Sequence, residues 1–125
     1  MATSFLGLRT AIYRVADIDA AKEWYSGILG IRPYFDEPFY VGFNVGGYEL
    51  GLQPQEGPVE EKGVSVVTYW GVENVAEAYD SFLAQGATHH ESPTDVGSGI
   101  VVASVRDPWG NLFGMIYNPH FRLDS

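Results

Sequence analysis

Two charged side chains, Arg14 and Glu49, stand in segments that alternate like β-strands, and each could take part in chemistry. A guanidinium can hold a carboxylate through two parallel hydrogen bonds, so Arg14 is a candidate for binding an acidic group of a small molecule. A carboxylate whose pKa is raised by burial can act as a general base, which makes Glu49 the candidate catalytic residue. The simpler alternatives are an ion pair of Arg14 with Glu49 or with Asp17.

The three histidines are the other residues that could bind a metal ion or move a proton. His89 and His90 are adjacent, so on a strand their side chains point to opposite faces and cannot both ligate one ion. A half-exposed strand or loop is the simpler interpretation for this pair, and His120 belongs to the C-terminal tail. The chain has no cysteine, which excludes disulfides, thiol nucleophiles and cysteine-ligated metals.

These residues need a frame of strands and helices to position them. A strand over 8–15 leads into a helix over 18–29, where apolar residues recur at three- and four-residue spacing. Asp17 is the expected N-cap of this helix, and Gly30 is its expected stop.

Extended segments follow over 32–35, 40–45 and 48–53, and the last two are joined by a Gly46-Gly47 pair that tolerates the positive φ of a two-residue hairpin. Residues 55–63 are rich in proline, glycine and glutamate, which predicts a linker. We therefore expect one domain over 1–125, with module one at about 8–54 and module two at about 64–119.

The second half repeats the order β-α-β-β-β. It has a strand over 64–70, a helix opened by Asn74 and ended by Gly86, and strands over 87–90, 100–106 and 111–117. Equivalent residues keep a constant spacing between the halves: Val15 and Val72, Ile18 and Val75, Tyr25 and Phe82. Gly51 and Gly114 keep a slightly longer spacing, which Gly47 and Gly110 share, so we interpret the chain as a divergent internal repeat.

Two motifs link this pattern to a known family. The stretch Asp107-Pro108-Trp109-Gly110-Asn111 predicts a tight turn that feeds an apolar strand, and Arg14-Val15-Ala16-Asp17 begins the first helix. Both resemble the vicinal-oxygen-chelate superfamily of glyoxalase I, bleomycin-resistance proteins and extradiol dioxygenases. The resemblance implies an α+β fold in which two tandem β-α-β-β-β modules form a curved, eight-stranded mixed sheet around a central cleft, with the helices outside.

Metalloenzymes of this superfamily carry four metal ligands, two in each module. The resemblance places these positions at Thr10, at Glu49 or Gly51, at Val67 and at Gly114. Threonine is a poor ligand, and valine and glycine offer no side-chain donor, so we expect no metal and no other cofactor. The alternative is a metal-dependent lyase, isomerase or dioxygenase of the glyoxalase I or extradiol dioxygenase type.

The cleft itself is predicted from strand alternation and from the resemblance. Its expected ligand-binding residues are Thr10, Arg14, Glu49, Gly51, Gln53, Val67, Tyr69, Trp109 and Gly114. The two glycines would leave room for a ligand, and the aromatic rings of Phe35, Phe39, Tyr40 and Trp109 could stack on a planar one. The segment Thr94–Gly99 is flexible by composition and is expected to act as a lid.

The most favoured function is therefore a glyoxalase-like or bleomycin-resistance-like protein that binds a small organic molecule in the cleft between the modules, with or without turnover. A net charge of −9 opposes nucleic-acid binding, and no apolar run approaches the roughly 20 residues that span a bilayer. We expect a cytoplasmic homodimer with no nucleic-acid or membrane partner.

Overall fold

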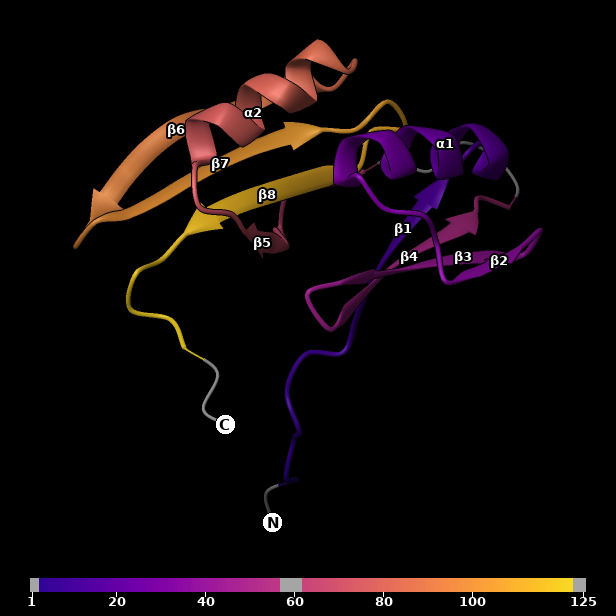
Figure 1. The fold of residues 1–125 in the computed structure, drawn as a ribbon, viewed down its shortest axis with the longest axis horizontal. Coiled ribbons are helices and arrows are strands. Elements are labelled where there is room, and N and C mark those ends of the chain that lie inside the picture. The colour runs from indigo at the N-terminus through magenta and orange to yellow at the C-terminus, as the bar shows by residue number, and fades with distance from the viewer. Residues whose placement is uncertain (1–2, 57–61, 123–125) are drawn as a thin grey trace. The chain divides into compact units, whose positions relative to one another are not determined.

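The computed structural model describes residues 3–56 and 62–122, and it divides the chain into two compact units, residues 1–59 and 60–125. Each unit contains one β-α-β-β-β module with one four-stranded mixed sheet (Figure 1). The two sheets have the same strand order, because β1-β4-β3-β2 in module one corresponds to β5-β8-β7-β6 in module two. The predicted α+β class and the tandem repeat are confirmed.

Module one consists of five elements: β1 (Thr10–Val15), α1 (Ile18–Leu29), β2 (Phe35–Glu37), β3 (Tyr40–Val45) and β4 (Tyr48–Pro54). Strand β1 runs parallel to β4, and the other two pairs are antiparallel. Helix α1 lies over one face of this sheet (Figure 1). On that face the strands bury Tyr13, Leu50 and Phe43, while the helix buries Tyr25, whose ring stacks on Tyr13 at 6.2 Å.

The predicted caps of α1 are confirmed. The side chain of Asp17 accepts a hydrogen bond from the backbone N–H of Ala20 at 3.1 Å, which satisfies one of the free donors at the helix start. Gly30 takes the left-handed conformation at φ 72°, and its N–H donates to the carbonyl of Ser26. Gly46 and Gly47 have φ values of 60° and 92°, as a two-residue hairpin between β3 and β4 requires.

Module two consists of β5 (Tyr69–Gly71), α2 (Val75–Ala84), β6 (Thr88–Gly97), β7 (Ile100–Arg106) and β8 (Leu112–Tyr117). Helix α2 covers one face of the sheet, where Phe82 packs on Phe113 with ring centroids 4.8 Å apart. Asn74 caps this helix as predicted, since its side-chain oxygen accepts from the N–H of Glu77 at 3.0 Å.

Three predicted strands differ in position. The strand expected over 32–35 lies at Phe35–Glu37, because Pro33 has no N–H to donate to a ladder. The strand expected over 64–70 is limited to Tyr69–Gly71, the residues that pair with Gly114–Ile116 of β8. The strand expected over 87–90 continues to Gly97, with register shifts that absorb the segment around Pro93.

The predicted lid at Thr94–Gly99 is therefore wrong. Thr94, Asp95 and Gly97 pair with β7, and only Ser98 and Gly99 lie between the two strands. Their positive φ values of 56° and 78° fit a tight hairpin. This segment is part of the sheet of module two, so we assign it no gating role.

Candidate functional site

The candidate site is the face of the module-one sheet that α1 does not cover. Alternation along β1 places Thr10, Ile12 and Arg14 on this face, and the burial pattern agrees, because these three are exposed while Tyr13 and Val15 are buried. The register extends the face across the sheet. Thr10 lies opposite Glu49, and Arg14 lies opposite Gln53.

Two glycines form the floor of this face. Ile12 lies opposite Gly51, Gly51 opposite Gly42, and Gly42 opposite Phe35, so one row crosses all four strands. A Cβ placed on Gly51 would overlap the hydroxyl oxygen of Tyr40 and would lie 2.7 Å from its Cζ atom. The space predicted for a ligand at Gly51 is thus filled by the ring of Tyr40.

The hydroxyl of Tyr40 donates a hydrogen bond to Oε2 of Glu49, one of the predicted site residues. Burial raises the pKa of Tyr40 above its ordinary value of 10.0, so the hydroxyl keeps its proton at neutral pH and remains a donor. A hydrogen bond to an ionised acceptor is stronger than one between neutral groups. Tyr40 therefore holds the carboxylate of Glu49 in a defined position over the glycine floor.

Two aromatic rings lie beside this carboxylate, and two more continue from them. A Cβ on Gly42 would lie 3.4 Å from Cε1 of Tyr34, 3.4 Å from Cε2 of Tyr40 and 3.5 Å from Cδ of Glu49, so these three side chains converge on one point. The ring of Phe35 lies 6.1 Å from that of Tyr40 and also 6.1 Å from that of Phe39. We call Tyr34, Phe35, Phe39, Tyr40 and Glu49 the aromatic–glutamate cluster.

The alternative in which Glu49 is the counter-ion of Arg14 is not what the structure shows. Within the described part of the chain, Glu49 forms no ion pair, and its one side-chain hydrogen bond comes from Tyr40. Arg14 is exposed and has an interaction elsewhere. The side chain of Glu49 is half-buried.

Module two repeats the glycine but not the carboxylate. A Cβ on Gly114 would lie 2.6 Å from Cδ1 of Tyr69 and 2.8 Å from the carbonyl oxygen of Thr68, so here too a tyrosine ring covers the glycine. Tyr69 is 41% exposed, and Val67 is half-buried before the start of β5. Tyr69 lies opposite Gly114 in the pairing of β5 with β8, and Val67 lies two residues before Tyr69. Neither side chain carries a charge.

The turn that carries the family motif has a structural role. Asp107 is 3% exposed, and its Oδ1 atom accepts hydrogen bonds from the backbone N–H groups of Trp109 and Asn111 at 2.9 and 2.8 Å. Its Oδ2 atom accepts from the side chain of Asn111, whose oxygen in turn accepts from Lys62. Trp109, a predicted ligand contact, is half-buried in this turn.

The histidines serve separate contacts. Tyr79 and Nδ1 of His89 share a hydrogen bond at 2.5 Å, whereas Nδ1 of His90 bonds the buried hydroxyl of Ser104 at 2.7 Å. His120 donates from Nε2 to the carbonyl of Ser98 at 2.8 Å. In residues 3–56 and 62–122, no three histidine or acidic side chains gather in a way that could hold a metal ion.

The side chains at the family's metal-ligand positions do not fit a metal ion. In module one, Thr10 faces Glu49 across β1 and β4, which supplies one carboxylate that already accepts from Tyr40. In module two, Val67 and Gly114 provide no side-chain donor atom. A tightly bound transition metal needs several imidazole, carboxylate or thiolate ligands, and these positions supply a single carboxylate.

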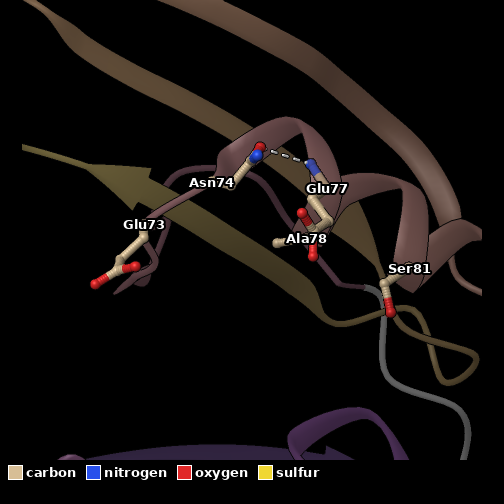
Figure 2. A pocket seen from close by; sticks show the side chains of 5 residues that line it. All are labelled: Glu73, Asn74, Glu77, Ala78 and Ser81. Carbon is tan, nitrogen blue, oxygen red and sulfur yellow. Dashed lines mark hydrogen bonds between the residues drawn. The ribbon is translucent and has the colours of Figure 1, made fainter.

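A hollow of about 370 Å³ lies elsewhere, beside the start of α2, as Figure 2 shows. It is lined by Glu73, Asn74, Glu77, Ala78 and Ser81. The oxygen of Asn74 is occupied by the helix cap, drawn as the dashed line, and none of the predicted site residues contributes. We do not assign the function to this hollow.

Tyr34 and Gly42 were not among the predicted site residues. The position of Gly42 could have been predicted, because a two-residue hairpin at Gly46-Gly47 sets Gly42 opposite Gly51. That of Tyr34 could not, since this residue lies outside the strands, where its N–H donates to the carbonyl of Gly42.

Comparison with known proteins agrees with this architecture. The Glyoxalase/Bleomycin resistance protein/Dioxygenase superfamily matches residues 7–115, so the chain belongs to this superfamily, as its motifs predict. No curated protein matches the chain significantly.

Solved structures with the same fold are distant in sequence. A glyoxalase-related enzyme from Fulvimarina pelagi is 17% identical, with a TM-score of 0.78 over 97% of this chain and 94% of that one. A lactoylglutathione lyase from Agrobacterium tumefaciens is 19% identical, with a TM-score of 0.72 over 97% and 100% of the two chains. A glyoxalase/bleomycin resistance protein from Albidiferax ferrireducens T118 is 22% identical, with a TM-score of 0.71 over 90% and 98%. At these identities the likeness concerns the fold alone.

Proposed function

We propose that this protein binds a small organic molecule through the aromatic–glutamate cluster on the open sheet face of module one, without the metal of its metalloenzyme relatives. The observation that carries the proposal is the hydrogen bond from Tyr40 to Glu49, which fixes a carboxylate beside the rings of Tyr34 and Tyr40. Ligand sites commonly combine apolar walls with a few polar groups of this kind.

The predicted neighbours have defined roles in this proposal. Gln53 is half-buried on the same face and offers an amide, and Arg14 lies opposite it on the edge strand. Thr10 lies opposite Glu49 and offers a hydroxyl. Contributions from Val67, Tyr69, Trp109 and Gly114, and the cleft between the modules, stay predictions, as does a role of Glu49 as a general base.

A thermal-shift screen tests the proposal. Drugs, aromatic acids and glutathione adducts are added to the purified protein, and a compound that binds only the folded state must raise the melting temperature. We expect at least one hit whose shift falls strongly in Glu49→Gln. Glu91→Gln, which removes an exposed carboxylate from β6, is the matched control and should leave the shift unchanged. If every hit keeps its full shift in Glu49→Gln, the site is elsewhere.

Metal content is measured separately on protein purified without a histidine tag. We expect substoichiometric zinc, nickel, manganese and iron, because the donor set cannot hold them. A stoichiometric metal would contradict the metal-free part of the proposal and would favour a lyase or dioxygenase instead.

The remaining predictions concern partners. We propose a homodimer, which light scattering at micromolar concentration tests, and a monomer there would refute it. Among the described residues, no helix is long and apolar enough to cross a membrane. A cytoplasmic location stays a prediction.

A further inference from the structure

The carboxylate of Glu49 has one oxygen in use and one available. Oε2 accepts from the hydroxyl of Tyr40, whereas Oε1 accepts no hydrogen bond from any residue that the structure describes. A half-buried carboxylate loses part of its hydration, and a positive partner or further donors would compensate this loss. A ligand that contacts Oε1 would therefore compensate the largest part of this lost hydration.

The basic side chains of module one do not supply that partner. Lys22 pairs with Asp36 at 3.2 Å, and Arg32 pairs with Glu23 at 3.2 Å. Arg9 donates to the backbone carbonyl of Leu6 at 3.1 Å. Together with the lack of an ion pair to Arg14, this leaves the negative charge of Glu49 uncompensated by the described residues.

The rings around Glu49 present a second feature that favours a cation. Tyr34 and Tyr40 approach within 3.4 Å of the same point over Gly42 at which Glu49 lies 3.5 Å away. Phe39 and Tyr34 are 64% and 65% exposed, so their rings are accessible from outside. The face of an aromatic ring attracts cations within about 6 Å of its centre, and several rings around a carboxylate reinforce this attraction.

We propose that the aromatic–glutamate cluster binds an alkylammonium group, so that the small molecule of the proposed function is an organic cation. This inference rests on the proposed function and specifies its ligand class. Oε1 of Glu49 faces the positive charge, and the rings of Tyr34, Phe39 and Tyr40 contact the alkyl groups that carry it. Tyr40 is also a positioning residue, because its hydroxyl holds the carboxylate. The net charge of −9 favours the approach of cations over long range.

A neutral competitor distinguishes this site from a generic apolar patch. An uncharged planar molecule could stack on Phe35 and Phe39 without using the charge of Glu49. Two compounds of the same shape, one charged and one neutral, therefore reveal whether the site selects cations.

The test compares tetramethylammonium with tert-butyl alcohol, which is similar in size and shape but uncharged. Each is titrated into the full chain at physiological ionic strength, and the ring signals of Tyr34, Phe39 and Tyr40 are followed by NMR. We expect saturable shifts with tetramethylammonium and at least roughly tenfold weaker binding of tert-butyl alcohol. Equal affinities, or no ring shifts with tetramethylammonium, would overturn the inference.

Variants then assign the contributions. Glu49→Gln should weaken tetramethylammonium binding by about tenfold or more, and Phe39→Leu by roughly two- to fivefold. The matched control for the ring is Phe121→Leu, because Phe121 is 65% exposed in the other unit, and its loss should change nothing. Tyr40→Phe keeps the ring but releases the carboxylate, so it should weaken binding less than Glu49→Gln does.

The same spectra separate this inference from the proposed function. If a neutral compound shifts the rings in a manner that depends on Glu49 while tetramethylammonium does not, the proposed function stands and the cationic ligand class is wrong. If no compound shifts the rings, both are wrong.

Discussion

The two glycines covered by tyrosine rings lead to a quantitative prediction about stability. Adding a methyl group at Gly51 or at Gly114 should destabilise the protein, whereas adding one at Gly71 should not. A Cβ at Gly51 would collide with Tyr40, and a Cβ at Gly114 would collide with Tyr69 and with the backbone, but a Cβ at Gly71 would meet nothing within 4 Å. All three residues lie in strands, so the intrinsic preference of alanine over glycine is common to them.

For Gly51→Ala, the collision is with the mobile end of a side chain. Tyr40 can swing away, but its hydrogen bond to Glu49 is then lost. A hydrogen bond to a charged group contributes about 1.5–3 kcal/mol, and alanine in a strand recovers about 0.5–1 kcal/mol relative to glycine. The expected net loss is about 1–2 kcal/mol.

For Gly114→Ala, part of the collision is with a carbonyl oxygen that cannot swing away. The oxygen of Thr68, 2.8 Å from the added Cβ, accepts a hydrogen bond from Gly114 N–H at 2.9 Å, which joins β8 to the residue before β5. Overpacking typically costs about 1–3 kcal/mol, and distorting this bond adds about 1 kcal/mol before the gain from alanine is subtracted. We expect a net loss of about 2–3 kcal/mol, which is more than for Gly51→Ala.

Urea unfolding followed by circular dichroism measures these differences. Because the chain has two compact units, the slope of each transition must first be shown to equal that of the wild type. Gly71→Ala should be neutral or stabilising by up to about 1 kcal/mol. If all three alanines change the free energy of unfolding equally, the rings do not occupy the positions described, and the reasoning fails.

Three further predictions follow from single contacts. Gly27→Ala in α1 should stabilise the protein by about 0.5–1 kcal/mol in the same urea assay, because a Cβ there meets nothing within 4 Å. Asp107→Ala should cost about 3 kcal/mol or more, since it removes the acceptor of three hydrogen bonds in a buried turn, and Asp80→Ala on the exposed side of α2 serves as its control. The pKa of Tyr40 is raised in the folded state, so its contribution to stability is complete below pH 10.0 and is lost as the pH rises above that value. Tyr40→Phe should reduce this alkaline loss, and the tyrosinate absorbance of the variant should lose a component that ionises late in the wild type.

Local signals in the sequence determine much of the fold. Asp17 and Asn74 are short polar residues placed just before apolar helical patterns, and both act as caps because their side chains reach the free N–H groups of the first turn. The Gly46-Gly47 hairpin was equally predictable, because few residue pairs accept two positive φ values in succession. Strand ends were less predictable, since the extent of β5 and β6 depends on which residues of β8 and β7 remain to pair with.

The site was predictable only in part. Alternation places Arg14, Glu49 and Gln53 on one face because a strand allows two directions only. The contact between Tyr40 and Glu49 was not predictable in the same way, because it needs the register of β3 against β4 and the direction in which a ring leans. A bare glycine in a strand indicates close approach by another group, but not whether that group is a ligand or a neighbouring tyrosine.

Comparison of equivalent residues in the two modules indicates which module binds a ligand. The spacing that relates Gly51 to Gly114 also relates Glu49 to Leu112, which is 7% exposed. Both modules cover their glycine with a tyrosine, but β3 supplies the ring in module one and β5 supplies it in module two. The contact between a tyrosine ring and a strand glycine therefore occurs in both modules and is explained by packing alone. Among the residues that the structure describes, the Glu49 carboxylate accepts a side-chain hydrogen bond from Tyr40 alone, and leucine stands at the equivalent position of module two. Glu49 is therefore the residue whose presence a ligand best explains.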